Sequence, residues 1–311
     1  MDTFTVSEAD AGARLDTWLS GRLSVSRSQL QQQVKQGAAT VNGKKASPHY
    51  VIKPGDEVSF EAMADERIEP RTIRAKTLMP EIDVVAELPG YVIINKPAGL
   101  LMHPASETSD EPTVVDWLLG RYPKARNVGE DPLRPGIVHR LDREASGLAA
   151  LATTQAAFDN LKEQFQKRTI TKRYTALVFG GDMPESGEIN FKIERSTQGG
   201  KMAARPLSQE GRSAVTEFSV VQRFHNYCLL SVVIKTGRTH QIRVHMSAYN
   251  HPIVGDDIYG GPKHRTLNKK FKLGRIFLVA TELGFADLEG KRHDFSVSLP
   301  ADLQEFLKQI K

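Results

Sequence analysis

Asp142 is the acidic side chain of this sequence that is best placed for covalent chemistry. It lies in residues 135–143, where the apolar pair Ile137-Val138 predicts a short strand leading into the acid. Arg140 and Arg143 flank it, and positive charge nearby favours the ionised form of a carboxyl group. An ionised carboxylate can act as a nucleophile, a general base or a member of an ion pair. From these local residues alone, a structural ion pair is the favoured interpretation.

Tyr174 is a second candidate, in a predicted strand over residues 170–179. Alternation along a strand puts Lys172, Tyr174 and Ala176 on one face. A ring beside a cation could act as an aromatic platform. An ordinary strand aromatic is the alternative interpretation.

Arg243 is a third candidate, in a predicted helix that Thr239 would cap. Ile242, Met246 and Tyr249 recur at helical spacing and predict its buried face. Arg243 is one step off that face, where it could reach a neighbouring carboxylate.

The elements around these residues divide the chain into a small module over 1–60, a linker over 61–80 and a larger domain over 81–311. In the module we expect a helix from Leu15 to Leu23 and a second helix starting at Ser26. Asn42-Gly43 predicts a hairpin turn, and a strand follows at Glu57–Phe60.

The larger domain combines a few helices with many strands. We expect a hairpin of strands 83–86 and 91–95, helices near 114–119 and 158–165, and a break at Ser146-Gly147 before a strand over 148–152. Further apolar strands are predicted over 214–221, 228–234 and 276–280. This pattern indicates an α+β fold with a mixed, mainly antiparallel sheet.

The composition is that of an ordinary globular protein. Of 311 residues, 40% are hydrophobic and 25% charged. No apolar stretch approaches the ~18 residues of a spanning helix, and the N-terminal residues lack a signal peptide's apolar run. We therefore expect a cytoplasmic protein without a membrane segment. Cys228 is the single cysteine, which excludes an internal disulfide and a cysteine-based metal site.

Positive charge is concentrated late in the chain, although the net charge is only +5. Residues 235–275 contain two acids and nine basic side chains: Lys235, Arg238, Arg243, Lys263, Arg265, Lys269, Lys270, Lys272 and Arg275. Such a segment suits a polyanion such as RNA. A solvated loop is the alternative interpretation.

The N-terminal module resembles the S4 RNA-binding domain. The resemblance covers residues 14–60, with two helices around Ser26-Arg27-Ser28, the Asn42-Gly43 turn and Lys53-Pro54-Gly55-Asp56. It implies RNA contacts from Arg27, Lys35 and Lys44. A packing module that does not bind RNA stays open, because seven basic and six acidic side chains nearly balance in residues 1–60.

The larger domain resembles the RluA-type pseudouridine synthases. The signature is His139-Arg140-Leu141-Asp142 followed by Ser146-Gly147-Leu148. Four further blocks occur in the family's order: 94–99 with His103-Pro104, 172–174 with Gly180, 236–245, and 252–256 with Tyr259-Gly260. The chain departs from the usual pattern at Val279 and after Phe285.

The resemblance implies roles for single residues. Asp142 would be the catalytic nucleophile, attacking either C1′ of the ribose or C6 of the base. Tyr174 would lie against the target base, and Arg140 would fill the gap left by the extruded uridine. Arg243 would pair with Asp142, although a phosphate-binding arginine is an alternative. The isomerisation needs no cofactor and no metal.

The implied partner is RNA, with RNA of the large ribosomal subunit favoured and no obligate protein partner. Further RNA contacts are expected from Lys172, Arg238, Lys269, Lys270 and Lys272. A tRNA substrate, a non-catalytic RNA-binding or ribosome-assembly factor and a carboxylate hydrolase are the alternatives. The hydrolase needs a second carboxylate in apposition, and no candidate stands out near the signature.

Overall fold

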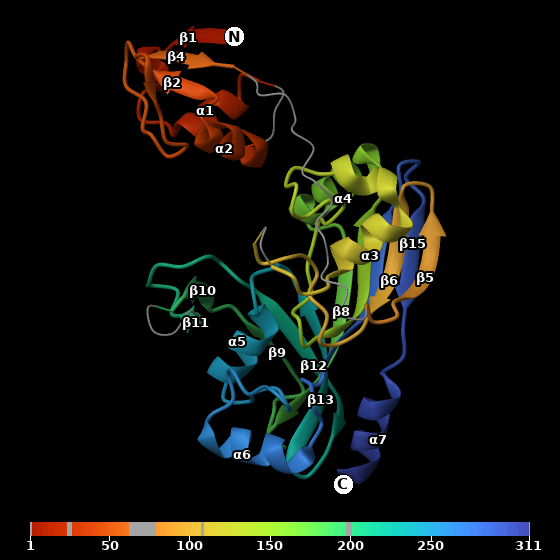
Figure 1. The fold of residues 1–311 in the computed structure, drawn as a ribbon. Helices are drawn as coiled ribbons and strands as arrows, with labels where there is room; N and C mark the ends of the chain where they lie inside the picture. The colour runs from red at the N-terminus through yellow and green to blue at the C-terminus, as the bar shows by residue number, and fades with distance from the viewer. Residues whose placement is uncertain (1, 24–26, 62–78, 107–108, 197–200, 311) are drawn as a thin grey trace. The chain divides into compact units, whose positions relative to one another are not determined.

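The computed structural model describes residues 2–23, 27–61, 79–106, 109–196 and 201–310 (Figure 1). The chain divides into two compact units: residues 1–74 with 105–110 and 129–135, and residues 75–104, 111–128 and 136–311. The linker predicted over 61–80 falls mostly on 62–78, outside the described residues. The domain limits 1–60 and 81–311 stay predictions.

The first unit packs two helices on a small antiparallel sheet. Its elements are β1 (Asp2–Thr5), η1 (Glu8–Asp10), α1 (Leu15–Ser20), α2 (Arg27–Gln36), β2 (Ala39–Val41), β3 (Lys44–Lys45) and β4 (Glu57–Phe60). The sheet has the order β1-β4-β2-β3. Leu15 and Leu19 of α1 and Leu30 of α2 are fully buried in its core.

The predicted hairpin turn is confirmed. Asn42 and Gly43 join β2 to β3 with φ angles of 52° and 75°, and a type I′ turn requires positive φ at both central residues. The strand over Glu57–Phe60 is also confirmed. The first helix ends at Ser20 instead of Leu23, and the predicted start of the second at Ser26 lies outside the described residues.

The second unit is built on a sheet of nine strands among the described residues. They follow the order β5-β6-β7-β14-β8-β13-β12-β9, and β15 pairs with β14. The strands are β5 (Asp83–Leu88), β6 (Tyr91–Lys96), β7 (Ser146–Ala152), β8 (Thr171–Phe179), β9 (Ser186–Ile189), β12 (Thr216–Arg223), β13 (Tyr227–Ile234), β14 (Leu278–Ala286) and β15 (Arg292–Ser296). Neighbours are antiparallel except β7 and β14. The predicted α+β class with a mixed, mainly antiparallel sheet is confirmed.

Helices and one separate hairpin complete this unit. They are α3 (Val114–Arg121), η2 (Pro123–Asn127), α4 (Gln155–Lys167), β10 (Lys192–Arg195) with β11 (Met202–Arg205), α5 (Gln241–Ala248), α6 (Pro262–Phe271) and α7 (Ala301–Gln309). α3 and α4 lie over the sheet in Figure 1, and Phe158 and Leu161 of α4 are buried in the main core. Within the described part of the chain, no helix is long and apolar enough to span a membrane.

Three predicted strand limits are wrong. Ile137 makes a single bridge to Leu151, so Asp142 lies in a loop. The chain turns at Gly136, whose φ is +71°. A side chain does not fit at this position, because the backbone of residue 152 lies too close. β7 begins at Ser146, so the Ser-Gly pair belongs to the strand, and the last long strand is 278–286 instead of 276–280.

Gly147 allows β7 and β14 to pair. Its φ is +112°, which L side chains rarely adopt. A Cβ built there would lie 2.3 Å from the oxygen and 2.5 Å from the nitrogen of Ala280. These two strands are parallel, with Ser146 opposite Val279 and Gly147 opposite Ala280. The close approach joins β5, β6 and β7 to the rest of the sheet.

Candidate active site

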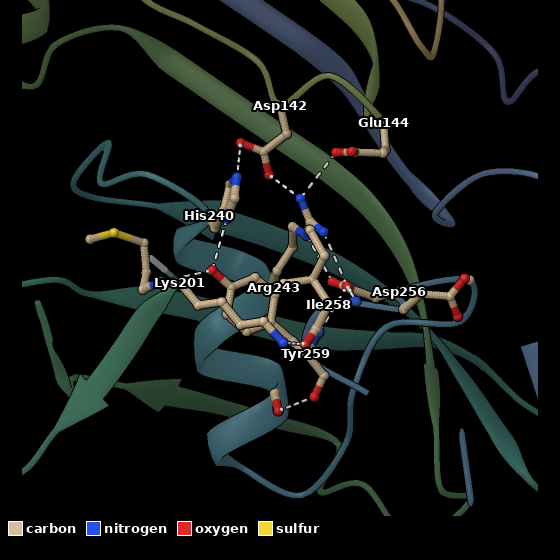
Figure 2. A network of polar contacts seen from close by, with 12 residues as sticks. Asp142, Glu144, Lys201, His240, Arg243, Asp256, Ile258 and Tyr259 are labelled. Atoms are coloured by element: carbon tan, nitrogen blue, oxygen red, sulfur yellow. Dashed lines mark hydrogen bonds and ion pairs between the residues drawn. The ribbon is translucent and has the colours of Figure 1, made fainter. Parts of the chain in front are cut away.

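Asp142 lies in the loop that leads into β7, and both of its carboxylate oxygens face a nitrogen atom (Figure 2). Oδ2 is 3.4 Å from Nη1 of Arg243, and Oδ1 is 3.9 Å from Nε2 of His240. The predicted contact between Arg243 and Asp142 is therefore present. The Asp142 side chain is 14% exposed, so the carboxylate is enclosed but remains reachable from solvent.

Arg243 is held chiefly by another acid, Asp256. Its Nε donates to Oδ2 at 2.7 Å and its Nη2 donates to Oδ1 at 3.0 Å. Burial opposes the charge on Arg243, but the hydrogen bonds and charge of Asp256, followed by the charges of Asp142 and Glu144, raise its pKa above the usual value. The remaining guanidinium nitrogen, Nη1, faces Asp142 and also contacts Glu144 at 3.2 Å.

The segment that carries Arg243 differs from the predicted amphipathic helix. The first six side chains of α5, from Gln241 onward, are all buried, so the helix has no solvent face there. Thr239 is not its N-cap. His240 precedes the helix in the left-handed conformation, and Gln241 Oε1 accepts from Thr236 Oγ1 at 2.7 Å and from the Arg238 N–H at 3.1 Å. These bonds close the loop in place of a capping threonine.

The loop over residues 256–259 supports both neighbours of Asp142. Asp256 Oδ1 accepts the backbone N–H groups of Ile258 at 2.9 Å and Tyr259 at 3.1 Å. The Tyr259 hydroxyl lies 2.8 Å from His240 Nδ1 and accepts from the backbone N–H of Met202 at 3.1 Å. Figure 2 shows this loop beside α5, on the other side of Arg243 from Asp142 and Glu144.

Tyr174 is buried in β8 and is 6% exposed. Burial, followed by the charge of Asp142, raises the pKa of its hydroxyl, so the two groups lie within electrostatic range. Lys172 places its Nζ 4.9 Å from the ring centroid of Phe165 on α4. Burial lowers the pKa of Lys172 to about 8. The structure therefore brings Tyr174 to the site and pairs the Lys172 ammonium with a different ring.

Lys96 is a buried group beside the site that no sequence pattern marked as functional. Its Nζ donates to the carbonyl oxygens of Pro97 at 2.8 Å, Leu100 at 2.7 Å and Arg143 at 3.2 Å. Burial lowers its pKa to about 7, against the opposing charge of Asp142. Lys96 thus ties the loop after β6 to the residue that follows Asp142.

The two arginines that flank Asp142 in sequence are not its partners. Arg143 turns away, donating to the Gly99 carbonyl at 3.1 Å and pairing with Glu111 at 3.2 Å. Arg140 is exposed. Consecutive side chains in an extended loop point in different directions, and the positive charge at Asp142 comes from a residue 101 positions later.

Several residues of the candidate site are not predicted from the sequence. Glu144 is an acid of the signature segment that carries no distinguishing pattern, and it contacts Arg243. Asp256 and Tyr259 stand in the block 252–260, and Lys96 in the block 94–99. The blocks contain these three residues without giving them a role. Their partners are distant in sequence, so only the fold reveals what each one contacts.

The predicted RNA-binding residues are dispersed over the molecule. In the first unit Lys35 and Lys44 are exposed, and the side chain of Arg27 lies outside the described residues. In the second unit Arg238 is half-buried and donates to the Ser213 carbonyl at 3.1 Å. The three late lysines, Lys269, Lys270 and Lys272, are exposed at the end of α6.

The basic segment 235–275 is not one surface, which corrects its interpretation as a single RNA-binding patch. Arg243 is 1% exposed and belongs to the site. Arg275 is largely buried: it donates to Ser146 Oγ and lies 3.6 Å from Asp302. Basic residues that are close in this sequence do not form one exposed surface, because α5, which carries Arg243, is a core helix.

The histidines of the signature blocks have separate environments. His139 Nε2 accepts the N–H of Ala150 at 3.0 Å, and its ring stacks on Phe165. His245 lies 3.0 Å from the Thr216 hydroxyl and 2.9 Å from the Phe191 carbonyl. Among the described residues, no group of three His, Cys, Asp or Glu side chains is arranged to hold a metal ion.

Comparison with known proteins agrees with this fold. Residues 90–248 match the RNA pseudouridylate synthase family, and residues 13–58 match the S4 domain. The chain therefore belongs to the RNA pseudouridylate synthase family, and it is an isomerase that converts uridine in RNA to pseudouridine. Cys228 is fully buried in the core of this domain.

Relatives extend over nearly the whole chain. Ribosomal large subunit pseudouridine synthase D of Escherichia coli (strain K12) is 35% identical over 99% of this chain and 94% of its own. An uncharacterized RNA pseudouridine synthase of Chloroflexus aurantiacus is 39% identical, covering 98% and 92%. The solved human RNA pseudouridylate synthase domain containing 1 has a TM-score of 0.58 at 24% identity, over 72% of this chain and 87% of that one, which supports the fold.

Proposed function

We propose that this enzyme modifies uridine in the RNA of the large ribosomal subunit, with Asp142 as its nucleophile. The relatives named as ribosomal large subunit pseudouridine synthase D support this substrate. The S4 match over residues 13–58 adds a second RNA-binding unit to the catalytic one. Such a substrate agrees with the cytoplasmic location expected from the sequence.

The chemistry moves one bond. The N1–C1′ bond breaks, the uracil turns, and C1′ bonds to C5, while C5 loses a proton and N1 gains one. Asp142 bonds either to C1′ of the ribose or to C6 of the base, and that bond breaks again before the product leaves, so no oxidant, reductant or energy source is consumed. Asp142 has to be ionised and oriented for this sequence of steps.

The observation that supports Asp142 most directly is its surroundings. Arg243 is fully buried and held by two hydrogen bonds to Asp256, so its charge stands beside Oδ2 before RNA binds. Preorganised charge of this kind costs no rearrangement at the moment of reaction. We propose that Tyr174, which lies within electrostatic range of the same carboxylate, contacts the target base.

Arg140 is proposed to occupy the space that the extruded uridine leaves in the RNA. It is exposed and lies two residues before Asp142, so it can extend toward RNA while the carboxylate stays enclosed. A planar guanidinium can stack between bases, which a lysine ammonium does poorly. Extrusion of a base costs a few kcal/mol, and this contact would offset part of that cost.

The test compares cells that lack the gene with cells that express the wild type or Asp142→Asn. Pseudouridines are mapped in ribosomal and transfer RNA. We expect sites in large-subunit RNA to be lost and to return only with the wild type, while Asp142→Asn still binds the transcript in a filter assay. Loss confined to tRNA would overturn the substrate, and restored sites with Asp142→Asn would overturn the nucleophile.

A further inference from the structure

His240 and Tyr259 form the second of two supports under Asp142. The first is Arg243, which Asp256 holds. The second begins at Oδ1 of Asp142, passes through the His240 ring and ends at the Tyr259 hydroxyl (Figure 2). The same loop, 256–259, therefore supplies the partner of each group that faces the carboxylate.

Tyr259 is placed to set which nitrogen of His240 bears the proton. Its hydroxyl oxygen accepts the N–H of Met202 at 3.1 Å and has one proton to donate. Nδ1 of His240, at 2.8 Å, is the other polar group that the described residues place on this oxygen. When the hydroxyl donates to Nδ1, that nitrogen is an acceptor, and the proton of the neutral ring is on Nε2.

The environment of the His240 ring favours its neutral form. Burial lowers the pKa of His240; the charge of Asp142 opposes this shift, and the charge of Arg243 reinforces it. A neutral ring has a single N–H, so its position matters. With the proton on Nε2, the ring presents a donor to Asp142, whereas the other tautomer would direct a lone pair at the carboxylate.

We propose that Tyr259 is a positioning residue for the reaction, acting through His240, whose Nε2–H it directs at Oδ1 of Asp142. The inference rests on Asp142 as the nucleophile. The present separation of 3.9 Å is longer than a hydrogen bond, and it closes when RNA binds, since catalytic hydrogen bonds are often long in the free enzyme. Oδ1 held by His240 and Oδ2 held by Arg243 then fix the carboxylate plane.

The tautomer can be read without any activity measurement. Two-dimensional ¹H–¹⁵N spectra of histidine-labelled enzyme distinguish Nε2–H from Nδ1–H, and His240→Gln identifies the signals of this ring among the nine histidines. We expect Nε2–H in the wild type and a mixture in Tyr259→Phe. A wild-type ring protonated on Nδ1 would overturn the proposal whether or not Asp142 is the nucleophile.

Kinetics test whether the tautomer matters for the reaction. Tyr259→Phe should lower kcat roughly 10-fold, the lower end of the loss seen when the hydrogen-bond partner of a metal-ligating histidine is removed, with KM for RNA within about twofold. The control is Tyr91→Phe, which removes another hydroxyl of this unit, one bonded to Asn160 at 3.1 Å, and should leave kcat unchanged.

A double variant separates positioning from packing. The amide nitrogen of His240→Gln can donate to Asp142 without a tautomer to choose. In that background Tyr259→Phe should cause no further loss of kcat, because Tyr259 acts through His240. Equal losses of kcat in both backgrounds would show that Tyr259 acts independently of His240 and would overturn the proposal. Loss of all turnover in Asp142→Asn is a separate result that reports on the nucleophile.

Discussion

Arg243 and Asp256 form a buried two-point ion pair, with Nε–Oδ2 at 2.7 Å and Nη2–Oδ1 at 3.0 Å and each side chain 1% exposed. Asp142 receives only Nη1, at 3.4 Å. The position of the guanidinium is therefore set from behind the site, and Asp142 uses a cation that another residue has already oriented.

Asp256→Asn should therefore affect the enzyme more than Glu144→Gln. Removing one partner of a buried ion pair leaves an uncompensated charge, and we expect a loss of roughly 3 kcal/mol in the free energy of unfolding, together with a large fall in kcat. Glu144 shares Nη1 but is 39% exposed, so its loss should cost less than about 1 kcal/mol. Chemical denaturation and single-turnover rates on the same RNA measure both, and similar effects from the two variants would contradict this ranking.

Gly147→Ala should disrupt the junction of β7 and β14. A Cβ there meets the backbone of Ala280 at 2.3 Å, and the residue has φ of +112°, so neither a side-chain movement nor a small backbone shift relieves the clash. We expect destabilisation of roughly 3 kcal/mol or more, read as a fall in Tm.

The matched control is Gly120→Ala in α3. A Cβ at this position meets nothing within 4 Å, and alanine is favoured over glycine in a helix by roughly 0.5–1 kcal/mol. Its Tm should stay the same or rise. If the two alanine variants melted at similar temperatures, the explanation of Gly147 would be wrong.

His139 should make the protein less stable in acid. Burial, followed by the charge of Lys172, lowers its pKa to about 3, whereas an unfolded histidine titrates near 6.5. Between these values the unfolded chain binds a proton that the folded chain does not. The contribution of neutral His139 to the free energy of unfolding is therefore fully present above about pH 6.5. It decreases by roughly 1.4 kcal/mol per pH unit as the pH drops below that value.

His139→Gln isolates this contribution. The glutamine can still accept the N–H of Ala150, which His139 accepts at 3.0 Å, but it does not titrate. Between about pH 7 and about pH 5 the Tm of the wild type should fall more than that of the variant. Parallel curves would show that His139 does not contribute to acid sensitivity, since the other histidines are common to both proteins.

The late lysines should contribute to RNA binding through charge. Lys269, Lys270 and Lys272 are exposed, and removing a lysine that binds a phosphate should reduce the slope of log K against log salt by roughly 0.7–0.9. We expect a flatter slope when all three are changed to alanine. Lys308→Ala, an exposed lysine paired with Glu305 at 3.1 Å, is the control. An unchanged slope in the triple variant would mean that the end of α6 does not bind RNA.

Local patterns predicted the elements well. Asn42-Gly43 specified its hairpin because both residues tolerate positive φ, and α4 followed from the spacing of Phe158 and Leu161. The limits failed where tertiary contacts decide them. Ile137 has a strand-like sequence, but Gly136 turns the chain beside residue 152, and only a bridge forms.

Sequence motifs predicted three residues of the candidate site, and the other residues of the site could not be predicted. Asp142, Tyr174 and Arg243 were named from motifs, and the structure brings them together. Asp256 and Tyr259 belong to a motif that assigns them no role, because a hydrogen bond between residues brought together by folding leaves no local periodicity in the sequence. The flanking arginine Arg143 was expected to be a partner of Asp142, but its guanidinium points to Glu111.

The burial of α5 limits how this enzyme can change. A surface helix offers one side on which substitutions are tolerated, but the first six side chains of α5 are inside the protein. A substitution near Arg243 therefore alters core packing and the charge beside Asp142 together. Substitutions at exposed positions outside α5, such as Lys269 and Lys270 of α6, leave this packing and this charge undisturbed.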